Sequence, residues 1–162
     1  MAGPHTLAET ERAAESRISG LELDMESLHV VSNLFRAANA VRNYMEHDVL
    51  APADLTWTAF VVMWVTWIWG TAETRVIAEE TGVSKATLSG VLTTLEKRDL
   101  VTRTKSAEDG RLVLVELTPS GRRLIKRVFP QINAAETHAT RMLPAKEETA
   151  ELLRLLVKAV SD

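Results

Sequence analysis

The hydrophobic period changes once in the middle of the chain, and this change most narrows the folds that the chain can adopt. Over residues 74–98, apolar side chains recur every three or four residues, which predicts helices. Over 101–105 and 112–117, apolar and polar residues alternate instead, which predicts strands. The Asp109-Gly110 pair between these strands is a strong signal for a tight turn. The order of helices followed by a β-hairpin predicts a winged helix-turn-helix.

Residues that favour helix ends divide the helical part in two. Gly82 can close a first helix over 74–81, because glycine readily adopts the left-handed conformation found just after a helix. Ser84 can cap a second helix that runs to about Arg98. We expect four apolar residues of the second helix to face the core: Leu88, Val91, Leu92 and Leu95.

Two further segments precede this motif. An amphipathic pattern over 23–49 predicts a helix that stops at Pro52. Thr56 can cap a following helix over 57–68, which is apolar nearly all round and is therefore expected to be buried on several sides. Residues 1–21 are polar and lack an apolar stripe, so a frayed helix or a disordered arm is expected there.

Helices are also predicted after the hairpin. The pattern favours one helix over 119–141, with Pro130 as a candidate kink, and a last helix over 144–160. The apolar helices at the two ends of the chain have no second core in the sequence to cover. Two chains that pair their terminal helices would bury these faces, which predicts an obligate symmetric dimer.

Charge is distributed unevenly along the chain. The net charge is −3, which by itself does not favour a nucleic-acid partner. The segment from Val83 to Arg127, however, has ten Lys and Arg against five Asp and Glu, which gives it +5 and leaves −8 for the rest. Because phosphate binding needs a basic face and not a basic protein, this segment is a candidate DNA-binding surface.

Several classes of protein are disfavoured by composition. The chain has no cysteine, which excludes disulfides, thiolate metal sites and thiol redox sensing. The first residues lack the apolar centre of a signal peptide, and the most apolar run, Trp57–Trp69, is too short to span a bilayer. The histidines are scattered, and no nucleophile–base pair or phosphate-binding glycine loop is visible. We expect a cytoplasmic, non-enzymatic protein without a metal, a cofactor or a membrane partner.

Residues 81–121 contain several short motifs in a distinctive order. Gly82-Val83-Ser84 lies in the turn, Asp109-Gly110-Arg111 lies in the wing, and Leu117-Thr118 is followed by Gly121. In this order and spacing, they resemble the MarR family of bacterial transcriptional regulators. The wing motif, at its distance from Leu-Thr-x-x-Gly, is the most specific part, and the resemblance extends from about Leu28 to the end of the chain.

We therefore expect a mainly α fold with a small β-hairpin wing, flanked by N- and C-terminal dimerisation helices. The expected parts are a flexible arm over 1–21, a dimerisation region over 22–54 and 119–162, and a DNA-binding domain over 55–118. The resemblance implies a homodimer that binds double-stranded DNA, with one recognition helix per protomer in the major groove and the wing tip in the minor groove. Many family members are repressors that a small aromatic or phenolic ligand releases, so such an effector is expected.

The expected DNA contacts lie on the outward face of the second helix and on the wing. Short hydroxyl side chains can bond base edges or phosphates, and Lys85 can reach a phosphate or guanine. Arg111 at the hairpin tip can enter a narrow minor groove, with Asp109 orienting its guanidinium. The expected residues are Ser84, Lys85, Thr87, Ser89, Gly90, Thr93, Thr94, Arg103, Lys105, Asp109 and Arg111. Four basic residues of the next helix can contact phosphates or pair with acidic residues of the partner, and the sequence favours neither role: Arg122, Arg123, Lys126 and Arg127.

The recognition helix departs from the family pattern at two positions. Members often carry arginine where this chain has Gly90 and Thr94. A glycine inside a helix costs about 0.5–1 kcal/mol relative to alanine, and it removes a bidentate contact to guanine. We expect weaker or more shape-dependent recognition, and glycine permits close approach of the helix backbone to DNA.

The tryptophans of the apolar helix admit two interpretations. Core packing is favoured, because large apolar groups recur there at helical spacing. Alternatively, Trp64 lines a pocket for an aromatic ligand, with polar contacts from His29, Asn33 and Arg36 of the preceding helix.

Two other functions compete with a ligand-responsive regulator. A winged-helix module that dimerises or binds protein without reading DNA is favoured modestly by Gly90 and the negative net charge, and is opposed by Arg111. An enzyme that carries a winged-helix dimerisation domain is disfavoured, because the length leaves no residues for a catalytic domain.

Overall fold

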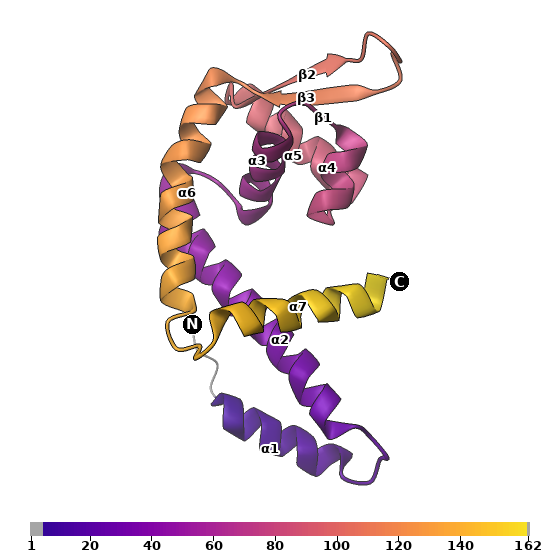
Figure 1. Cartoon of the computed structure of the whole chain (residues 1–162), viewed down its shortest axis with the longest axis vertical. Helices are drawn as coiled ribbons and strands as arrows, with labels where there is room; N and C mark the ends of the chain where they lie inside the picture. The colour runs from indigo at the N-terminus through magenta and orange to yellow at the C-terminus, as the bar shows by residue number, and fades with distance from the viewer. Residues whose placement is uncertain (1–4, 162) are drawn as a thin grey trace. The chain divides into compact units, whose positions relative to one another are not determined.

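A computed structural model of the chain describes residues 5–161. Most of the chain is helical, and three short strands form one antiparallel sheet (Figure 1). The elements in chain order are α1 (Leu7–Ile18), α2 (Met25–Met45), a π-helical turn (Glu46–Leu50), a 3₁₀ turn (Ala51–Ala53), α3 (Trp57–Trp69), β1 (Ala72–Glu73), α4 (Thr74–Thr81), α5 (Lys85–Lys97), β2 (Val101–Lys105), β3 (Val113–Leu117), α6 (Pro119–Ala139) and α7 (Lys146–Ser161). The chain divides into two units at the boundary between Ala38 and Asn39, and each unit is described by itself.

Among the described residues, no single helix is long and apolar enough to cross a membrane. Only the segments 25–53 and 57–69, taken together as a bent pair, have the required length and composition.

In the first unit, α1 is a capped helix. Thr6 Oγ1 accepts a hydrogen bond from Glu9 N (3.2 Å), and Glu9 Oε2 accepts one from Thr6 N (2.7 Å), which completes a capping box. Residues 1–21, expected to form a frayed helix or a disordered arm, thus contain a regular helix with a capped N-terminus. Residues 1–4 of that arm lie outside the described part of the chain.

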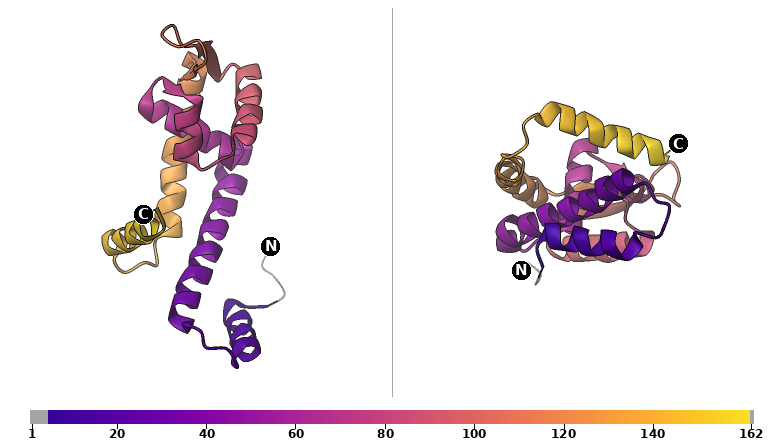
Figure 2. Two further views of the ribbon diagram at one scale, coloured as in Figure 1. Left: turned by 90° about the vertical axis from the view of Figure 1, so that its right-hand side faces the viewer. Right: turned by 90° about the horizontal axis from the view of Figure 1, so that it is seen from below.

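Helix α1 lies beside the N-terminal part of α2, and the two run antiparallel (Figure 2). The contacts between them are polar. Glu11 Oε1 accepts a hydrogen bond from Asn33 Nδ2 (3.1 Å) and lies 3.6 Å from Arg36 Nη1, while Glu15 Oε1 lies 3.1 Å from His29 Nε2. Two glutamates of α1 therefore engage the polar side chains of α2.

Helix α3 lies in the core of the second unit. Thr56 caps it by accepting a hydrogen bond from Ala59 N (3.1 Å), as the sequence predicts, and Gly70 (φ 77°) ends it. Its buried residues are Ala59, Phe60, Val62, Met63, Val65 and Thr66. Trp64 stacks on Phe129 of α6, with ring centroids 4.3 Å apart and ring planes 6° from parallel. Helix α3 is apolar nearly all round because other elements pack against several of its sides.

The sheet has the strand order β1-β3-β2, and both pairs of strands are antiparallel. Val115 of the central strand β3 pairs with Ala72 of β1 on one side and with Arg103 of β2 on the other. The hairpin of β2 and β3 confirms the predicted wing. Strand β1 was not predicted, because two residues are too few to show an alternating pattern.

The junction of α5, β2 and α6 is tightly built. Thr118 caps α6 by accepting a hydrogen bond from Gly121 N (3.0 Å), and its own hydroxyl donates to the carbonyl oxygen of Asp99 (2.6 Å). A Cβ atom on Gly121 would lie 2.0 Å from the carbonyl oxygen of Leu100. Glycine is therefore required here, which gives a physical reason for the Leu-Thr-x-x-Gly motif.

Arg98 ties the C-terminal end of α5 to the loop before α3. Its guanidinium donates hydrogen bonds to the carbonyl oxygens of Asp54 and of Ala53 (3.3 Å), and lies 3.4 Å from the Asp54 carboxylate. Because these elements lie far apart in the sequence, this contact fixes the recognition helix to the rest of the winged helix.

Candidate nucleic-acid interface

Helices α4 and α5 form the predicted helix-turn-helix. Gly82 follows α4 in the left-handed conformation (φ 67°), and Ser84 caps α5 by accepting a hydrogen bond from Thr87 N (3.1 Å). Leu88, Leu92 and Leu95 are buried, and Val91 is half-buried. This anchoring leaves one side of α5 free of core contacts. Of the residues expected there, Thr93 is half-buried and the others are exposed: Ser84, Lys85, Thr87, Ser89, Gly90 and Thr94.

The threonine hydroxyls of α5 are engaged within the helix. Thr93 Oγ1 donates to the carbonyl oxygen of Ser89 (2.9 Å), and Thr94 Oγ1 donates to that of Gly90 (3.1 Å). Thr87 Oγ1 lies 2.9 Å from Ser84 Oγ in the helix cap. Sequence reasoning treated these hydroxyls as free, because propensities do not reveal such local bonds.

The wing is attached to α5 through Arg103. Its Nε and Nη2 atoms lie 3.1 Å and 2.5 Å from Glu96 Oε2. Hydrogen bonds from Arg103 lower the pKa of Glu96 below its usual 4.5. Arg103 was expected to be a DNA contact, and the structure shows that its guanidinium is already paired inside the winged helix.

This pair predicts a pH dependence of stability. Because the folded-state pKa of Glu96 is lowered, its ionised form stabilises the folded state above pH 4.5, and this contribution is lost as the pH falls through the folded-state pKa. We expect Glu96→Gln to lower the free energy of unfolding at neutral pH, with a deficit that shrinks in acid. Urea denaturation over a pH series measures both effects. A deficit of the same size in strong acid would contradict the assignment, and Glu79→Gln, whose pair with Arg75 spans 3.9 Å, serves as the control.

The turn at the tip of the wing is exposed and contains Arg111, and Lys105 is exposed at the end of β2. Asp109 Oδ1 accepts a hydrogen bond from the backbone N–H of Arg111 (2.9 Å). The expected bond from the Arg111 guanidinium to Asp109 is therefore corrected: an Asx turn uses the carboxylate locally, and within residues 5–161 the guanidinium has no ion pair. The structure leaves Arg111 unpaired at the exposed tip.

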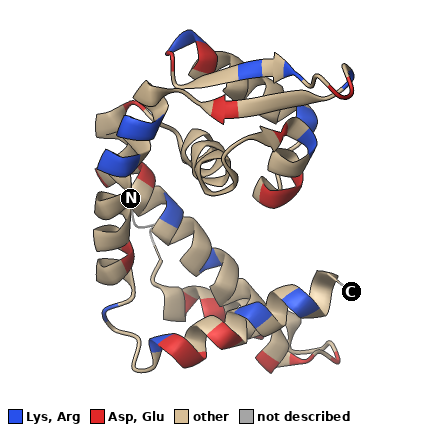
Figure 3. Ribbon diagram, turned by 45° about the horizontal axis from the view of Figure 1, so that its top comes forward, with Lys and Arg blue, Asp and Glu red and all other residues tan. Residues whose placement is uncertain are grey.

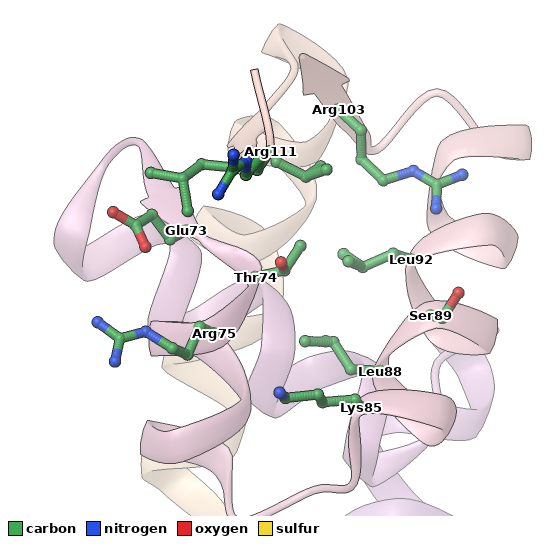
Figure 4. A pocket seen from close by; sticks show the side chains of 11 residues that line it. Glu73, Thr74, Arg75, Lys85, Leu88, Ser89, Leu92, Arg103 and Arg111 are labelled. Carbon is green, nitrogen blue, oxygen red and sulfur yellow. The ribbon is translucent and has the colours of Figure 1, made fainter. Parts of the chain in front are cut away.

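A hollow of about 380 Å³ lies between α4, α5 and the wing (Figure 4). Lys85 points into it from α5, and Arg111 lies on its wing side above Glu73. Arg75 lines it from α4 and is a basic residue that the sequence reasoning missed. Its place in the first turn of the helix before the recognition helix was the available signal. Four basic side chains from three elements thus surround one surface: Arg75, Lys85, Arg103 and Arg111.

Basic residues lie along α6 (Figure 3), and their contacts divide them into two kinds. Arg122 Nη2 lies 2.6 Å from Glu116 Oε1, and Arg123 Nη2 donates to Ser120 Oγ (3.0 Å). Lys126 and Arg127 have no ion pair among the described residues. Of the two alternatives for this group, phosphate or partner acid, the structure favours neither.

The residues proposed for a ligand pocket lie in separate units. His29, Asn33 and Arg36 belong to the first unit, where they contact glutamates of α1. Trp64 belongs to the second, where it is half-buried and stacks on Phe129. Core packing therefore accounts for Trp64 within its unit.

Comparison with known proteins identifies the family to which this winged helix belongs. The model of the MarR family matches residues 55–113. YwaE of Bacillus subtilis, an uncharacterized HTH-type transcriptional regulator, is 37% identical over 140 residues, which span 86% of this chain and 81% of YwaE. The chain belongs to the MarR family. It is a transcriptional regulator and not an enzyme, as the sequence predicts.

Solved structures of MarR-family proteins have the same fold. BpsR of Bordetella bronchiseptica, whose DNA binding is regulated by 6-hydroxynicotinic acid, superposes with a TM-score of 0.71 at 27% identity, over 83% of this chain and 99% of BpsR. A variant of Escherichia coli MarR complexed with operator DNA gives a TM-score of 0.73 at 21% identity, over 86% and 99% of the two chains. The second likeness shows the fold alone.

Proposed function

We propose that this MarR-family regulator is a homodimeric repressor that binds DNA through α5 and the wing, and that a small aromatic acid releases it. The observation that carries the proposal is the basic surface between α5 and the wing. Its exposed cations, Lys85 and Arg111, have no ion pair among the described residues. Unpaired cations at one surface are what phosphate binding requires.

Each element has a separate role in this proposal. Helix α5 enters the major groove, with Lys85 near its N-terminus close to the phosphates or a guanine. The wing tip places Arg111 in the adjacent minor groove, where a narrow groove has the most negative potential. Arg103 supports the wing through its hydrogen bonds with Glu96.

Dimerisation is supported by helix α7. The helix buries none of its residues, although it carries a wide apolar face. Its exposed apolar residues are Leu152, Leu153, Leu155, Val157 and Val160. Apolar surface of this extent on one helix is typical of a protein interface. We infer that α7 packs on the terminal helices of a second copy, within the dimerisation region 22–54 and 119–162.

A double substitution tests this interface. We expect Leu153→Glu combined with Val157→Glu to convert a dimer into a monomer, because both side chains lie on one face of α7 and the new charges would be buried between the chains. Size-exclusion chromatography with light scattering measures the mass. Lys158→Glu adds a carboxylate on the same helix and is expected to leave the dimer intact. A double variant that stays dimeric would place the interface elsewhere.

The effector is proposed by analogy with a relative. DNA binding of BpsR, which is 27% identical, is regulated by 6-hydroxynicotinic acid, an aromatic acid. Arg36 is suited to bind the carboxylate of such a ligand. Its Nη1 atom lies 3.6 Å from Glu11 Oε1, so the ligand would have to displace the Glu11 carboxylate. A protein of this kind acts on the chromosome, so we place it in the cytoplasm.

The first experiment is a titration of the protein with the intergenic DNA beside its own coding region, at several salt concentrations. We expect binding far tighter than to a random duplex, a decrease in affinity with salt, and release by some members of a panel of aromatic acids. Binding across a promoter should lower transcription from it in vitro. Equal binding to both duplexes would instead support a module that dimerises or binds protein without reading DNA.

A further inference from the structure

The exposed side of α5 lacks the side chains that read guanine and adenine by paired hydrogen bonds. No arginine, asparagine or glutamine occurs between Ala86 and Glu96. Bidentate contacts from arginine or lysine to guanine, and from asparagine or glutamine to adenine, are the main direct readout in the major groove. Lys85, at the N-terminal end of the helix, is the single residue of α5 before Lys97 that could make one.

The hydroxyl protons of Thr93 and Thr94 are used inside the helix. Thr93 and Thr94 donate to carbonyl oxygens one turn earlier in the helix, and the Thr87 and Ser84 hydroxyls share one hydrogen bond in the cap, in which either can donate. A hydroxyl has one proton, so a threonine that donates to its own helix cannot donate to a base at the same time. What Thr94 can offer outward is its methyl group and a lone pair.

Gly90 adds a hollow beside these methyl groups. A depression of about 440 Å³ lies between the start of α3 and the side of α5 that carries Thr87, Gly90 and Thr94, with Ala59 and Val91 in its lining. A Cβ atom on Gly90 would meet nothing within 4 Å, so packing inside the chain does not require glycine there. Glycine destabilises a helix at such a position, and no contact within the described chain offsets this loss of stability. The space beside Gly90 is therefore open to a group from outside the chain.

We propose that α5 reads thymine through its C5 methyl group, which enters the hollow at Gly90 between Thr87 and Thr94. Thymine is the base that presents an apolar group in the major groove, and threonine methyl groups are suitable partners for it. The inference rests on the proposed DNA-binding function and deepens it, because it names the base that the helix selects.

The test begins with the native protein and a library of randomised DNA duplexes. We expect the selected sites to contain thymine at positions that face α5, and each such thymine is then replaced by deoxyuridine, which lacks the methyl group. Loss of one buried methyl group should weaken binding about fourfold. A selected site on which every uracil substitution is neutral would overturn the inference and leave DNA binding intact. Absence of any selected sequence would overturn both.

Two substitutions at Thr94 separate its methyl group from its hydroxyl. Thr94→Val keeps the methyl group of threonine and replaces the hydroxyl by a second methyl group. This variant should retain the preference for thymine over uracil. Thr94→Ser keeps the hydroxyl and loses the methyl group, so its preference should fall to about one at the facing position. Thr137→Ser, the same chemical change at an exposed position of α6 where the threonine also donates to a carbonyl oxygen one turn earlier, should retain the preference. The opposite pattern, with loss in the valine variant and retention in the serine variant, would show readout by the hydroxyl and overturn the inference.

Discussion

Gly121→Ala is expected to lower the free energy of unfolding by about 3 kcal/mol, because the added methyl group overpacks a site bounded by backbone atoms. The new Cβ atom would lie 2.0 Å from the carbonyl oxygen of Leu100, which already accepts a hydrogen bond from Thr118 N (3.1 Å). Neither group can move away without breaking the junction of α5, β2 and α6. For a chain of 162 residues, a loss of this size should lower Tm by roughly 6–12 °C. Urea and thermal denaturation measure both quantities.

Gly90→Ala provides the matched control, since it makes the same chemical change on a helix whose added Cβ atom meets nothing within 4 Å. There the substitution should raise stability by about 0.5–1 kcal/mol, because alanine favours the helix. Opposite signs at the two positions are the expected result. Similar small effects at both would mean that α6 shifts freely away from Leu100, and that the motif glycine has some other role.

Arg111→Ala is expected to weaken binding to operator DNA about tenfold or more and to reduce the slope of log affinity against log salt by about 1. Arg111 lies at the exposed wing tip, and its guanidinium has no ion pair within residues 5–161. The substitution should therefore cost the fold little and DNA binding much. Fluorescence anisotropy with a labelled duplex at several salt concentrations measures affinity and slope.

Two further variants distinguish a groove contact from a general effect of charge. Arg141→Ala removes the same charge from an exposed position beyond α6, and binding should change little. Arg111→Lys keeps the charge but loses the planar fork, so its affinity should lie between those of the native protein and the alanine variant. If Arg141→Ala weakened binding as much as Arg111→Ala, net charge and not the wing tip would explain the effect.

Signals carried by single residues predicted most of the second unit. The caps at Thr56 and Ser84, and the left-handed glycine at Gly82, mark helix ends because each satisfies groups that the backbone leaves open there. The alternating pattern around Asp109-Gly110 likewise gave both strands of the hairpin. These features are local, so a sequence displays them directly.

Features that depend on a partner residue were not predictable in this way. The pairing of Arg103 with Glu96 joins a strand to a helix, and the contact of Gly121 with Leu100 joins two elements through the backbone. The role of Asp109 was misassigned because a carboxylate at a turn can serve the backbone or a side chain, and the backbone N–H of Arg111 was nearer. The sequence shows whether a side chain is charged, polar or apolar, whereas the fold determines which residue each side chain contacts.

Helix α6 is held to the winged helix at two points along its length. Near its N-terminus, Gly121 lies against Leu100, and two turns later Phe129 stacks on Trp64 of α3. Eight residues of helix separate these points, a span of about 12 Å. Two contacts this far apart restrict pivoting about either one, so residues 121–129 of α6 and the DNA-binding elements are expected to move together. In a dimer, a displacement of this segment would then move the recognition helix and change its distance from the recognition helix of the second copy.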